Sequence, residues 1–212
     1  MRDASFRPPV ELGGRWVRLV PLRPEHAGPL ARALPPLDDI RYLGLRPGRT
    51  PTEMAQHIAE LLRRQAEGTD LPFALVRASD GAVVGATRYL KIDRPNDAVE
   101  IGGSWLDRAV WRTPVNTESK FLLLRHAFET EGAVRVALQT DLRNERSQRA
   151  IARLGALREG IIRADRLTGD DYRRSSVVYS ILTDEWPRVQ RRLTEFLARP
   201  WAGAPDARPP TA

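Results

Sequence analysis

The sequence predicts a single α/β (α+β) domain, built on a mixed, mostly antiparallel sheet of six to seven strands with helices on both faces. Three observations support this fold class. The chain has 212 residues, which is enough for one well-buried domain and short for two. Segments that alternate like strands are interspersed with segments of helical periodicity. Short turn signals join several consecutive strands, and such turns make neighbouring strands antiparallel.

The first part of the domain is expected to contain one strand and two helices. The strand occupies residues 15–22, and the first helix follows at residues 23–34 with Pro24 near its start. The second helix, at residues 50–68, has clear signals at both ends. These are Thr50 as the N-cap, Pro51 at the first helical position, Glu53 at the capping-box spacing and Gly68 at the end.

Three consecutive strands are predicted next, at residues 71–78, 82–93 and 97–106. The turn signals between them are Ser79-Asp80-Gly81 and Arg94-Pro95-Asn96. Both connections are short, so we expect the three strands to be antiparallel neighbours in the sheet.

The segment "WRTPVNTESKFLLLRHAFE", residues 111–129, predicts a helix with an unusual start. Thr113 is a suitable N-cap and Pro114 fits the first helical position. Three N–H groups after Pro114 then have no carbonyl partner one turn back, and the positive end of the helix dipole lies beside them. Such an end suits an anion, typically a phosphate. The alternative is an ordinary solvated helix start capped by Thr113.

The last part of the domain is expected to hold a strand, a short helix, a hairpin and a final helix. The strand lies at residues 134–141, and the short helix runs from Asn144 to Leu154 and stops at Gly155. The remaining predicted elements are strands at 157–167 and 172–182, joined around Thr168-Gly169-Asp170, and a helix at 183–199. We expect the domain to span residues 10–199, with a flexible N-terminus at 1–9 and a disordered tail at 200–212.

Composition excludes several classes of function. The chain has no cysteine and only three scattered histidines, so no metal site is expected. The net charge is +7, but the basic residues are spread along the chain without a dense block or interleaved aromatics, which makes nucleic-acid binding the weaker alternative. No signal peptide or bilayer-length apolar run is present, so we expect a cytoplasmic protein without a membrane partner.

The order of these elements resembles the GNAT acetyltransferase superfamily, in particular its ribosomal-protein N-acetyltransferase-like (RimJ/RimL-like) branch. The resemblance extends from about Val10 to Arg199, so it implies a single GNAT-type domain over 10–199. The segments that carry it are "VEIGGSW", "NTESKFLLLRHAFE", "TDLRNERSQRAIARLGALREG" and "VVYSILTDEWP". The resemblance implies acetyl-coenzyme A (acetyl-CoA) as the acetyl donor, without a metal or a covalent intermediate.

The resemblance places the pyrophosphate of acetyl-CoA at the start of the helix at 111–129, with one departure from the family pattern. The usual loop is Gln/Arg-x-x-Gly-x-Gly/Ala, whereas the matching positions here are Trp111, Pro114 and Asn116. Pro114 lacks a backbone donor. The residues on which the phosphate would then rely are Arg112, Thr113, Val115, Asn116 and Thr117, with the Arg112 guanidinium adding a charged contact.

Two further segments are implied in cofactor binding. The backbone at Gly103, Ser104 and Trp105 would receive the pantetheine arm, and Gly102-Gly103 permits a β-bulge there, although glycine pairs in strands are often only loosely packed backbone. Asn144 would contact the arm, and Ser147 would lie near the sulfur and could return a proton to it. The alternative for Asn144 and Ser147 is plain helix capping.

Glu100 is the candidate general base, acting on the amine directly or through water, because carboxylates on the matching strand of the family face the substrate cleft. Its alternative role is an ion pair with Lys91, which would lie roughly opposite. We expect Tyr179, Trp105 and His126 to be packing groups. Three arginines of the short helix form a basic stripe for which a solvated face is favoured over a phosphate site, namely Arg146, Arg149 and Arg153.

The sequence therefore predicts an N-acetyltransferase that moves an acetyl group from acetyl-CoA directly to a primary amine. The acceptor is a protein or peptide N-terminus or a small-molecule amine, and a homodimer is compatible with the sequence. The altered loop around Pro114 keeps one alternative open: a catalytically silent protein of the same fold that binds acyl-CoA or a partner without turnover.

Overall fold

The computed structural model describes residue 6, residues 10–168 and residues 172–201. Most of the expected flexible N-terminus, the turn centre at Gly169-Asp170 and the tail from residue 202 lie outside the described residues. The strands of the described part are β1 Leu12–Gly13, β2 Val17–Pro21, β3 Leu71–Arg77, β4 Val83–Asp93, β5 Ala98–Leu106, β6 Arg135–Asp141, β7 Leu157–Leu167 and β8 Arg173–Leu182.

These strands form one sheet in the order β1-β2-β3-β4-β5-β6-β8-β7. The sheet has eight strands rather than the expected six to seven, because the two-residue β1 adds an edge that is too short to show a sequence pattern. The β5–β6 pair is parallel and the other pairs of the described sheet are antiparallel. The predicted mixed, mostly antiparallel sheet is therefore confirmed.

The α-helices of the described part are α1 Ala27–Ala33, α2 Leu37–Ile40, α3 Pro51–Ala66, α4 Val115–Arg125, α5 Glu145–Leu154 and α6 Trp186–Leu197. The capping box of α3 is present: Glu53 N–H donates to Thr50 Oγ1 over 3.2 Å, and Thr50 N–H donates to Glu53 Oε2 over 3.0 Å. Gly155 ends α5 in the left-handed region, with φ 100°. The four-residue α2 was not expected, since one helical turn is too short for periodicity to reveal.

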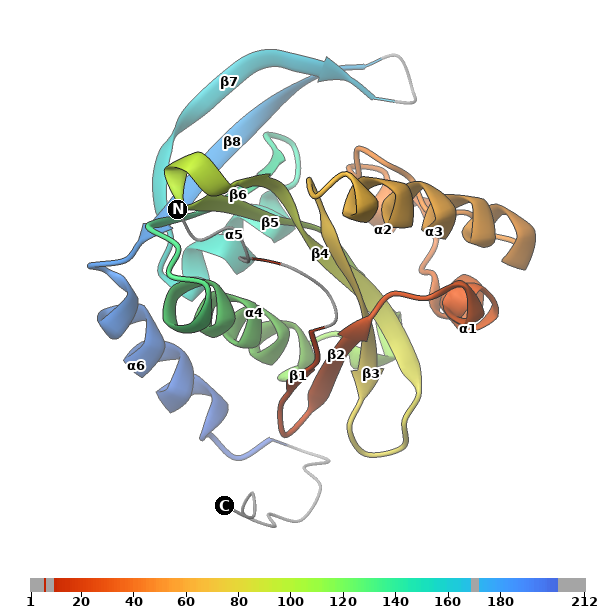
Figure 1. Ribbon diagram of the computed structural model, residues 1–212, viewed down its shortest axis with the longest axis horizontal. Coiled ribbons are helices and arrows are strands. Elements are labelled where there is room, and N and C mark those ends of the chain that lie inside the picture. Colours follow the sequence, from red (N-terminus) through yellow and green to blue (C-terminus); the bar gives the residue numbers. More distant parts are fainter. Residues whose placement is uncertain (1–5, 7–9, 169–171, 202–212) are drawn as a thin grey trace.

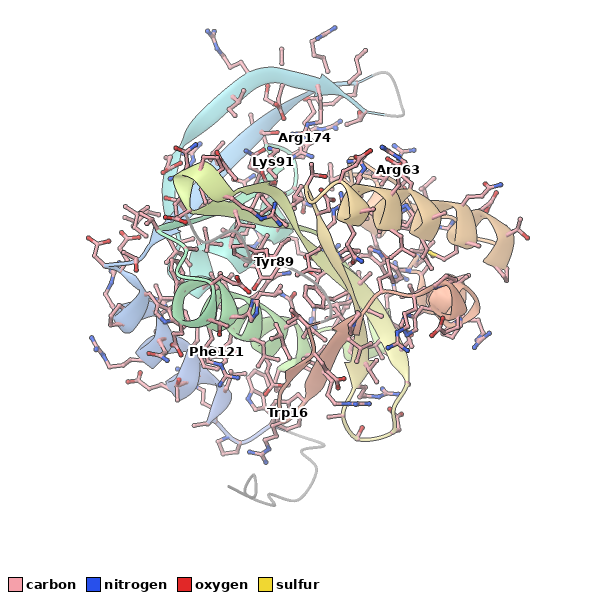
Figure 2. All side chains as sticks on the ribbon, in the orientation of Figure 1. Trp16, Arg63, Tyr89, Lys91, Phe121 and Arg174 are labelled. Carbon is pink, nitrogen blue, oxygen red and sulfur yellow. The ribbon has the colours of Figure 1, made fainter. Side chains whose placement is uncertain are left out.

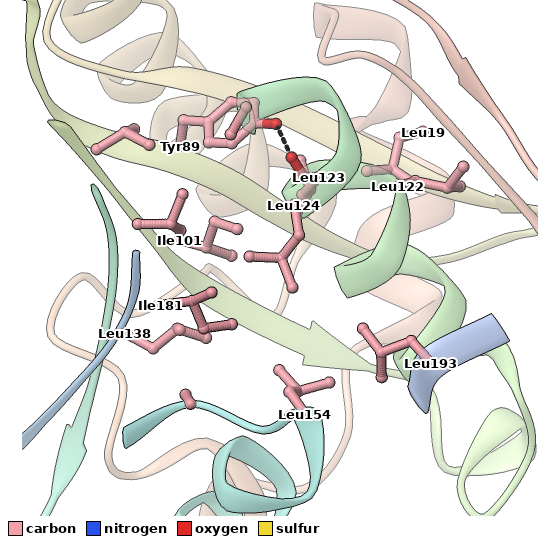
Figure 3. Packing of buried hydrophobic residues seen from close by; sticks show 14 of the residues in the cluster. Leu19, Tyr89, Ile101, Leu122, Leu123, Leu124, Leu138, Leu154, Ile181 and Leu193 are labelled. Carbon is pink, nitrogen blue, oxygen red and sulfur yellow. Dashed lines mark hydrogen bonds between the residues drawn. The ribbon is translucent and has the colours of Figure 1, made fainter. Parts of the chain in front are cut away.

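Helices cover both faces of the sheet, and each face has its own apolar core (Figure 1). On one face, Leu122 and Leu124 of α4 and Leu193 of α6 pack towards the sheet, as Figure 3 shows. Tyr89 of β4 donates its hydroxyl to the Leu123 carbonyl over 2.5 Å, which fixes α4 on this face. The other face is covered by α1, α2 and α3, whose buried side chains include Leu30, Ile40 and Ile58.

The start of α4 differs by one residue from the prediction. Pro114, not Thr113, occupies the N-cap position, and the first helical bond runs from Glu118 N–H to the Pro114 carbonyl over 2.8 Å. The Thr113 hydroxyl donates instead to the Val110 carbonyl at 2.7 Å and lies 3.4 Å from Val115 N. The N-cap residue Pro114 makes no side-chain cap, and the Thr113 hydroxyl accepts only a long bond from the Val115 N–H.

A buried carboxylate anchors the first strands to α4. Glu118 accepts backbone N–H groups from Arg15, Trp16 and Val17 at 2.9, 2.6 and 2.9 Å. Burial raises the pKa of Glu118, while these three donors act in the opposite direction. Gly14 leaves room for this contact, because a Cβ there would lie 2.5 Å from the Glu118 carboxyl group.

The β7–β8 hairpin forms a curved arm at one end of the sheet (Figure 1). β7 is the edge strand, and it exposes several large apolar side chains, namely Leu157, Ile161, Ile162 and Leu167. No helix in the described part of the chain combines the length and apolar character needed to cross a bilayer.

Candidate active site

A gap opens between the two parallel strands in the middle of the sheet. β5 pairs with β6 at Ala98, Val99 and Glu100 only, whereas it stays paired with β4 as far as Leu106. From residue 101 to residue 106, the edge of β5 that faces β6 is therefore unpaired in the described structure. The two parallel strands therefore separate beyond Glu100.

The predicted bulge lies beside this gap. Ala86 of β4 is opposite Trp105, whereas Arg88 is opposite Gly102, so β5 has one extra residue between these two pairs. Gly103 adopts φ +59°, and a Cβ there would lie 3.1–3.3 Å from atoms of the Arg88 guanidinium. Glycine is required at this position both for its backbone conformation and for the close approach of Arg88.

The start of α4 follows the carboxyl end of β5 and offers free backbone donors. The N–H groups of Asn116 and Thr117 have no hydrogen-bond partner among the described residues. Arg153 of α5 donates to Thr117 Oγ1 over 3.1 Å and thus adds a guanidinium at the positive end of the helix. Arg112, in the preceding loop, is exposed and has φ +59°. The combination favours an anion.

The basic stripe of α5 is only partly the solvated face that the sequence favoured. Arg149 fits that expectation, since it is exposed and pairs with Glu145 at 3.1 Å. Arg153 instead reaches the start of α4, and Arg146 lies over the Trp111 ring, 4.2 Å from its centroid. Arg146 therefore joins the start of α5 to the loop before α4, and Arg153 joins the end of α5 to the first turn of α4, which periodicity within α5 alone did not reveal.

The start of α5 follows the carboxyl end of β6, so it lies at the same end of the parallel pair as the start of α4. Asn144 is the N-cap, and its Oδ1 accepts the Ser147 N–H at 3.1 Å. The capping role is therefore present in the structure. The Ser147 hydroxyl has no hydrogen-bond partner among the described residues. A pocket of about 230 Å³ adjoins Asn144, and its lining includes Asp39, Tyr42 and Arg143.

The unexpected α2 closes over this end of the sheet. Asp39 accepts the Arg108 Nε–H at 2.7 Å, and its other oxygen lies 3.8 Å from Arg146 Nη1. Arg108 comes from the β5–α4 loop and Arg146 from α5, so a single carboxylate links α2 to both sides of the site. No pattern in the sequence indicates this contact, which joins residues about 70 and 107 positions apart.

Glu100 is buried at the last paired position of β5, where the gap begins. Its Oε2 lies 2.8 Å from Lys91 Nζ, so the alternative ion pair is also present, although the Lys91 side chain is 55% exposed. Arg174 of β8 and Arg88 of β4 both interact electrostatically with Glu100, and burial lowers the pKa of each guanidinium. Figure 2 shows Lys91 and Arg174 in the region between the β7–β8 arm and the rest of the sheet.

Lys120 is a polar residue at the site that was not identified from the sequence. It is buried on α4, and its amine donates to Ser104 Oγ and, over 3.1 Å, to Thr87 Oγ1. No carboxylate among the described residues pairs with it, and burial lowers the pKa of Lys120 to about 7. A signal did exist, because Lys91 and Lys120 are the only lysines among 34 basic residues.

The residues expected to be packing groups are confirmed as such. Tyr179, Trp105 and His126 are 5%, 6% and 8% exposed. Ser104 and Trp105 are both on the bulged part of β5, but the Trp105 side chain belongs to the core beneath α1–α3, whereas the Ser104 hydroxyl faces α4 through Lys120. The predicted site residues thus lie at four places: the last β5–β6 pair at Glu100, the bulge of β5, the start of α4 and the start of α5.

Comparisons with known proteins agree with this geometry. A family model described as an acetyltransferase (GNAT) domain matches residues 17–157. A curated relative from Bacillus subtilis (strain 168), provisionally named ribosomal N-acetyltransferase YdaF, is 32% identical over 107 residues, which cover 50% of this chain and 57% of that protein. The match thus spans little more than half of the relative's length.

Solved structures share the same fold over nearly the whole domain. A protein from T. thermophilus, provisionally named an acetyltransferase, is 38% identical, with a TM-score of 0.81 over 91% of this chain and 99% of that one. Mycobacterium smegmatis RimJ, solved in complex with CoA-disulfide, is 22% identical, with a TM-score of 0.75 over 89% of this chain and 95% of its own. At that identity the second similarity concerns the fold alone.

Proposed function

The chain belongs to the acetyltransferase (GNAT) domain family, and from this premise we propose that it transfers an acetyl group from acetyl-CoA directly to a primary amine. The proposed acceptor is either a protein or peptide N-terminus or a small-molecule amine. The observation that carries the proposal is the gap between β5 and β6, which opens at the same end of the sheet as the starts of α4 and α5. A homodimer remains a prediction.

The pyrophosphate of acetyl-CoA is assigned to the start of α4. Support comes from the free N–H groups of Asn116 and Thr117 and from the nearby guanidinium of Arg153. Pro114 removes one donor, but it lies at the N-cap, outside the first turn, so the N–H groups of Asn116 and Thr117 remain available. The pantetheine arm is assigned to the unpaired edge of β5 at residues 103–105, where it can hydrogen-bond like an additional strand.

Acetyl transfer needs a neutral amine held against the thioester carbon and a path for the proton that the amine loses. Glu100 lies at the point where the gap begins, and we assign it the role of general base. Asn144 is assigned to the pantetheine arm, and the Ser147 hydroxyl to the sulfur, where it can return a proton to the departing thiolate. A thiol has a pKa of about 8.5, so Ser147 assists rather than being essential.

The chemistry of the base favours an acceptor that is already partly neutral. An α-amine with a pKa near 8 is about one-tenth neutral at pH 7, whereas a lysine amine of pKa about 10.4 needs roughly 4.6 kcal/mol to lose its proton there. Glu100 is one carboxylate, and Lys91 competes for it. A peptide α-amine or a low-pKa small amine therefore suits this site better than a lysine side chain.

Two measurements test the proposal in sequence. Saturating acetyl-CoA, at about a hundred times the dissociation constant, should stabilise the protein by roughly 2.7 kcal/mol in thermal unfolding. Thiol release is then followed over a panel of peptide N-termini and small amines. Stabilisation without thiol release from any amine would support the catalytically silent alternative, and the absence of any thermal shift would contradict acetyl-CoA binding itself.

The role of Glu100 has its own test. Glu100→Gln should slow turnover several-fold to a hundredfold at pH 7, and raising the pH should recover part of the loss, because more of the amine is then neutral without help. The pH–rate profile is measured on an N-terminal peptide and on its α-blocked, lysine-bearing counterpart. Faster acetylation of the lysine peptide, or a variant profile identical to that of the original protein, would refute this role.

A further inference from the structure

Lys120 lies directly beneath the bulge that borders the gap. Its amine, Thr87 Oγ1 and Ser104 Oγ form a closed triangle, in which the two hydroxyl oxygens are 2.7 Å apart and Thr87 lies 3.1 Å from the amine. Ser104 also approaches the Gly102 carbonyl at 3.4 Å, so the triangle is tied to the backbone of the bulge. The amine therefore reaches the proposed cofactor edge of β5 through one side chain.

The ionisable groups around Lys120 leave its charge uncompensated. On α4 itself, Glu118 is directed to the backbone of residues 15–17. Tyr89 of β4 contacts Leu123 and His126, further along the helix, and Arg153 of α5 reaches the helix start at Thr117. None of these groups shifts the titration of Lys120; burial alone lowers its pKa to about 7. Near neutral pH the amine is thus balanced between its charged and neutral forms.

We propose that Lys120 is a positioning residue that couples acetyl-CoA binding to the uptake of a proton. The inference rests on the proposed cofactor site. Lys120 is three to four residues from the free N–H groups of Thr117 and Asn116, which corresponds to about 5–6 Å along the helix axis. A negative charge about 10 Å away, at an effective dielectric constant of about 20, raises the pKa of an amine by about one unit. A bound pyrophosphate therefore holds the proton on Lys120, and the charged amine donates more strongly to Ser104 and fixes the bulge.

The sign of the pH dependence follows directly. Because the amine binds its proton more tightly in the complex than in the free protein, affinity is highest below pH 7 and falls as the pH rises through the window above it. A one-unit difference in pKa makes the affinity about tenfold weaker at pH 9 than at pH 6, and it corresponds to the uptake of about half a proton per bound molecule near pH 7.5.

The test is isothermal titration calorimetry with 3′-dephospho-coenzyme A, in two buffers of different ionisation enthalpy. This probe keeps the pyrophosphate but lacks the phosphate monoester, whose own pKa near 6 would add a second proton linkage. The original protein should take up about half a proton near pH 7.5. Binding without proton uptake overturns the inference and leaves the proposed function intact, whereas the absence of binding by dephospho-CoA, CoA and acetyl-CoA alike contradicts the proposed function.

Two variants assign the proton to one residue. Lys120→Met keeps an unbranched side chain only one atom shorter and should abolish the uptake, whereas Lys91→Met, which replaces the other lysine of the chain, should leave it unchanged. Uptake that persists in Lys120→Met overturns the inference. If that variant does not fold, Ser104→Ala serves in its place: loss of the accepting hydroxyl should move the uptake window to lower pH, and an unmoved window is equally contradictory.

Discussion

Replacing Lys120 by methionine should stabilise the protein at neutral pH. In the unfolded chain the amine has its ordinary pKa of 10.5, whereas in the folded protein burial lowers the pKa to about 7. Between these two values the folded state binds fewer protons than the unfolded state, so the stability of the original protein rises with pH. Methionine has no proton to lose, and the variant lacks this dependence.

The size of the effect follows from the two pKa values. Burial of the amine costs about 4 kcal/mol at pH 7 and less than about 1 kcal/mol at pH 10. Against this, the variant loses the bonds from Lys120 to Thr87 and Ser104, at about 1 kcal/mol each, although the two hydroxyls can still pair with one another over 2.7 Å. We expect Lys120→Met to be more stable by about 2 kcal/mol at pH 7 and less stable by about 1 kcal/mol at pH 10.

Urea denaturation of both proteins at pH 7, 8, 9 and 10 measures this difference, and groups common to the two proteins cancel. Lys91→Met, which removes an exposed amine paired with Glu100, is the matched control: it can shift stability by an offset, but that offset should stay constant from pH 7 to pH 9. A difference between Lys120→Met and the original protein that stays constant from pH 7 to pH 10 would refute the reasoning, because it would mean that Lys120 titrates normally when folded.

Three further substitutions test other parts of the site. Glu118→Ala should lower the free energy of unfolding by about 3–4 kcal/mol in urea denaturation, since it leaves three buried N–H groups without an acceptor; a loss below about 1 kcal/mol would show that water replaces the carboxylate. Gly103→Ala should cost about 1–2 kcal/mol and weaken acetyl-CoA binding in calorimetry, because φ +59° and Arg88 both disfavour a Cβ; unchanged affinity would separate the bulge from the cofactor. Asn144→Ala should lower the free energy of unfolding by about 1 kcal/mol, because an N-cap is lost, and should also lower turnover per folded molecule, followed by thiol release; unchanged turnover would leave Asn144 only its capping role.

Elements with several turns or with explicit end signals could be predicted from the sequence. The capping box at Thr50 and Glu53 and the left-handed Gly155 both fix helix ends through local chemistry, and the structure has them where expected. The bulge at Gly103 was predictable for the same reason, since a glycine pair inside a strand indicates a backbone conformation closed to other residues. The start of α4 was misplaced by one residue, because Pro114 rather than Thr113 occupies the N-cap and the Thr113 hydroxyl is directed to the Val110 carbonyl.

Contacts between distant segments could not be predicted in this way. Asp39 joins α2 to Arg108 and Arg146, and no periodicity connects positions so far apart. Lys120 was missed because α4 is buried on nearly all sides, so its pattern does not separate a core face from a solvent face. The proposed placement of the cofactor comes from the resemblance to a family, because the residues alone indicate only an anion at the start of α4.

The short pairing of β5 with β6 gives a central strand the amide chemistry of an edge strand. Three residues of β5, Ala98 to Glu100, join the two halves of the sheet, and beyond them the amides that point away from β4 have no partner strand. In hydrogen exchange, these amides of residues 101–106 should exchange quickly through local fluctuations. The amides of the same strand that are bonded to β4 should exchange more slowly, because they need a larger opening of the structure. A ligand that completes the ladder would slow the first class selectively, so exchange rates along one strand would register occupancy of the gap residue by residue.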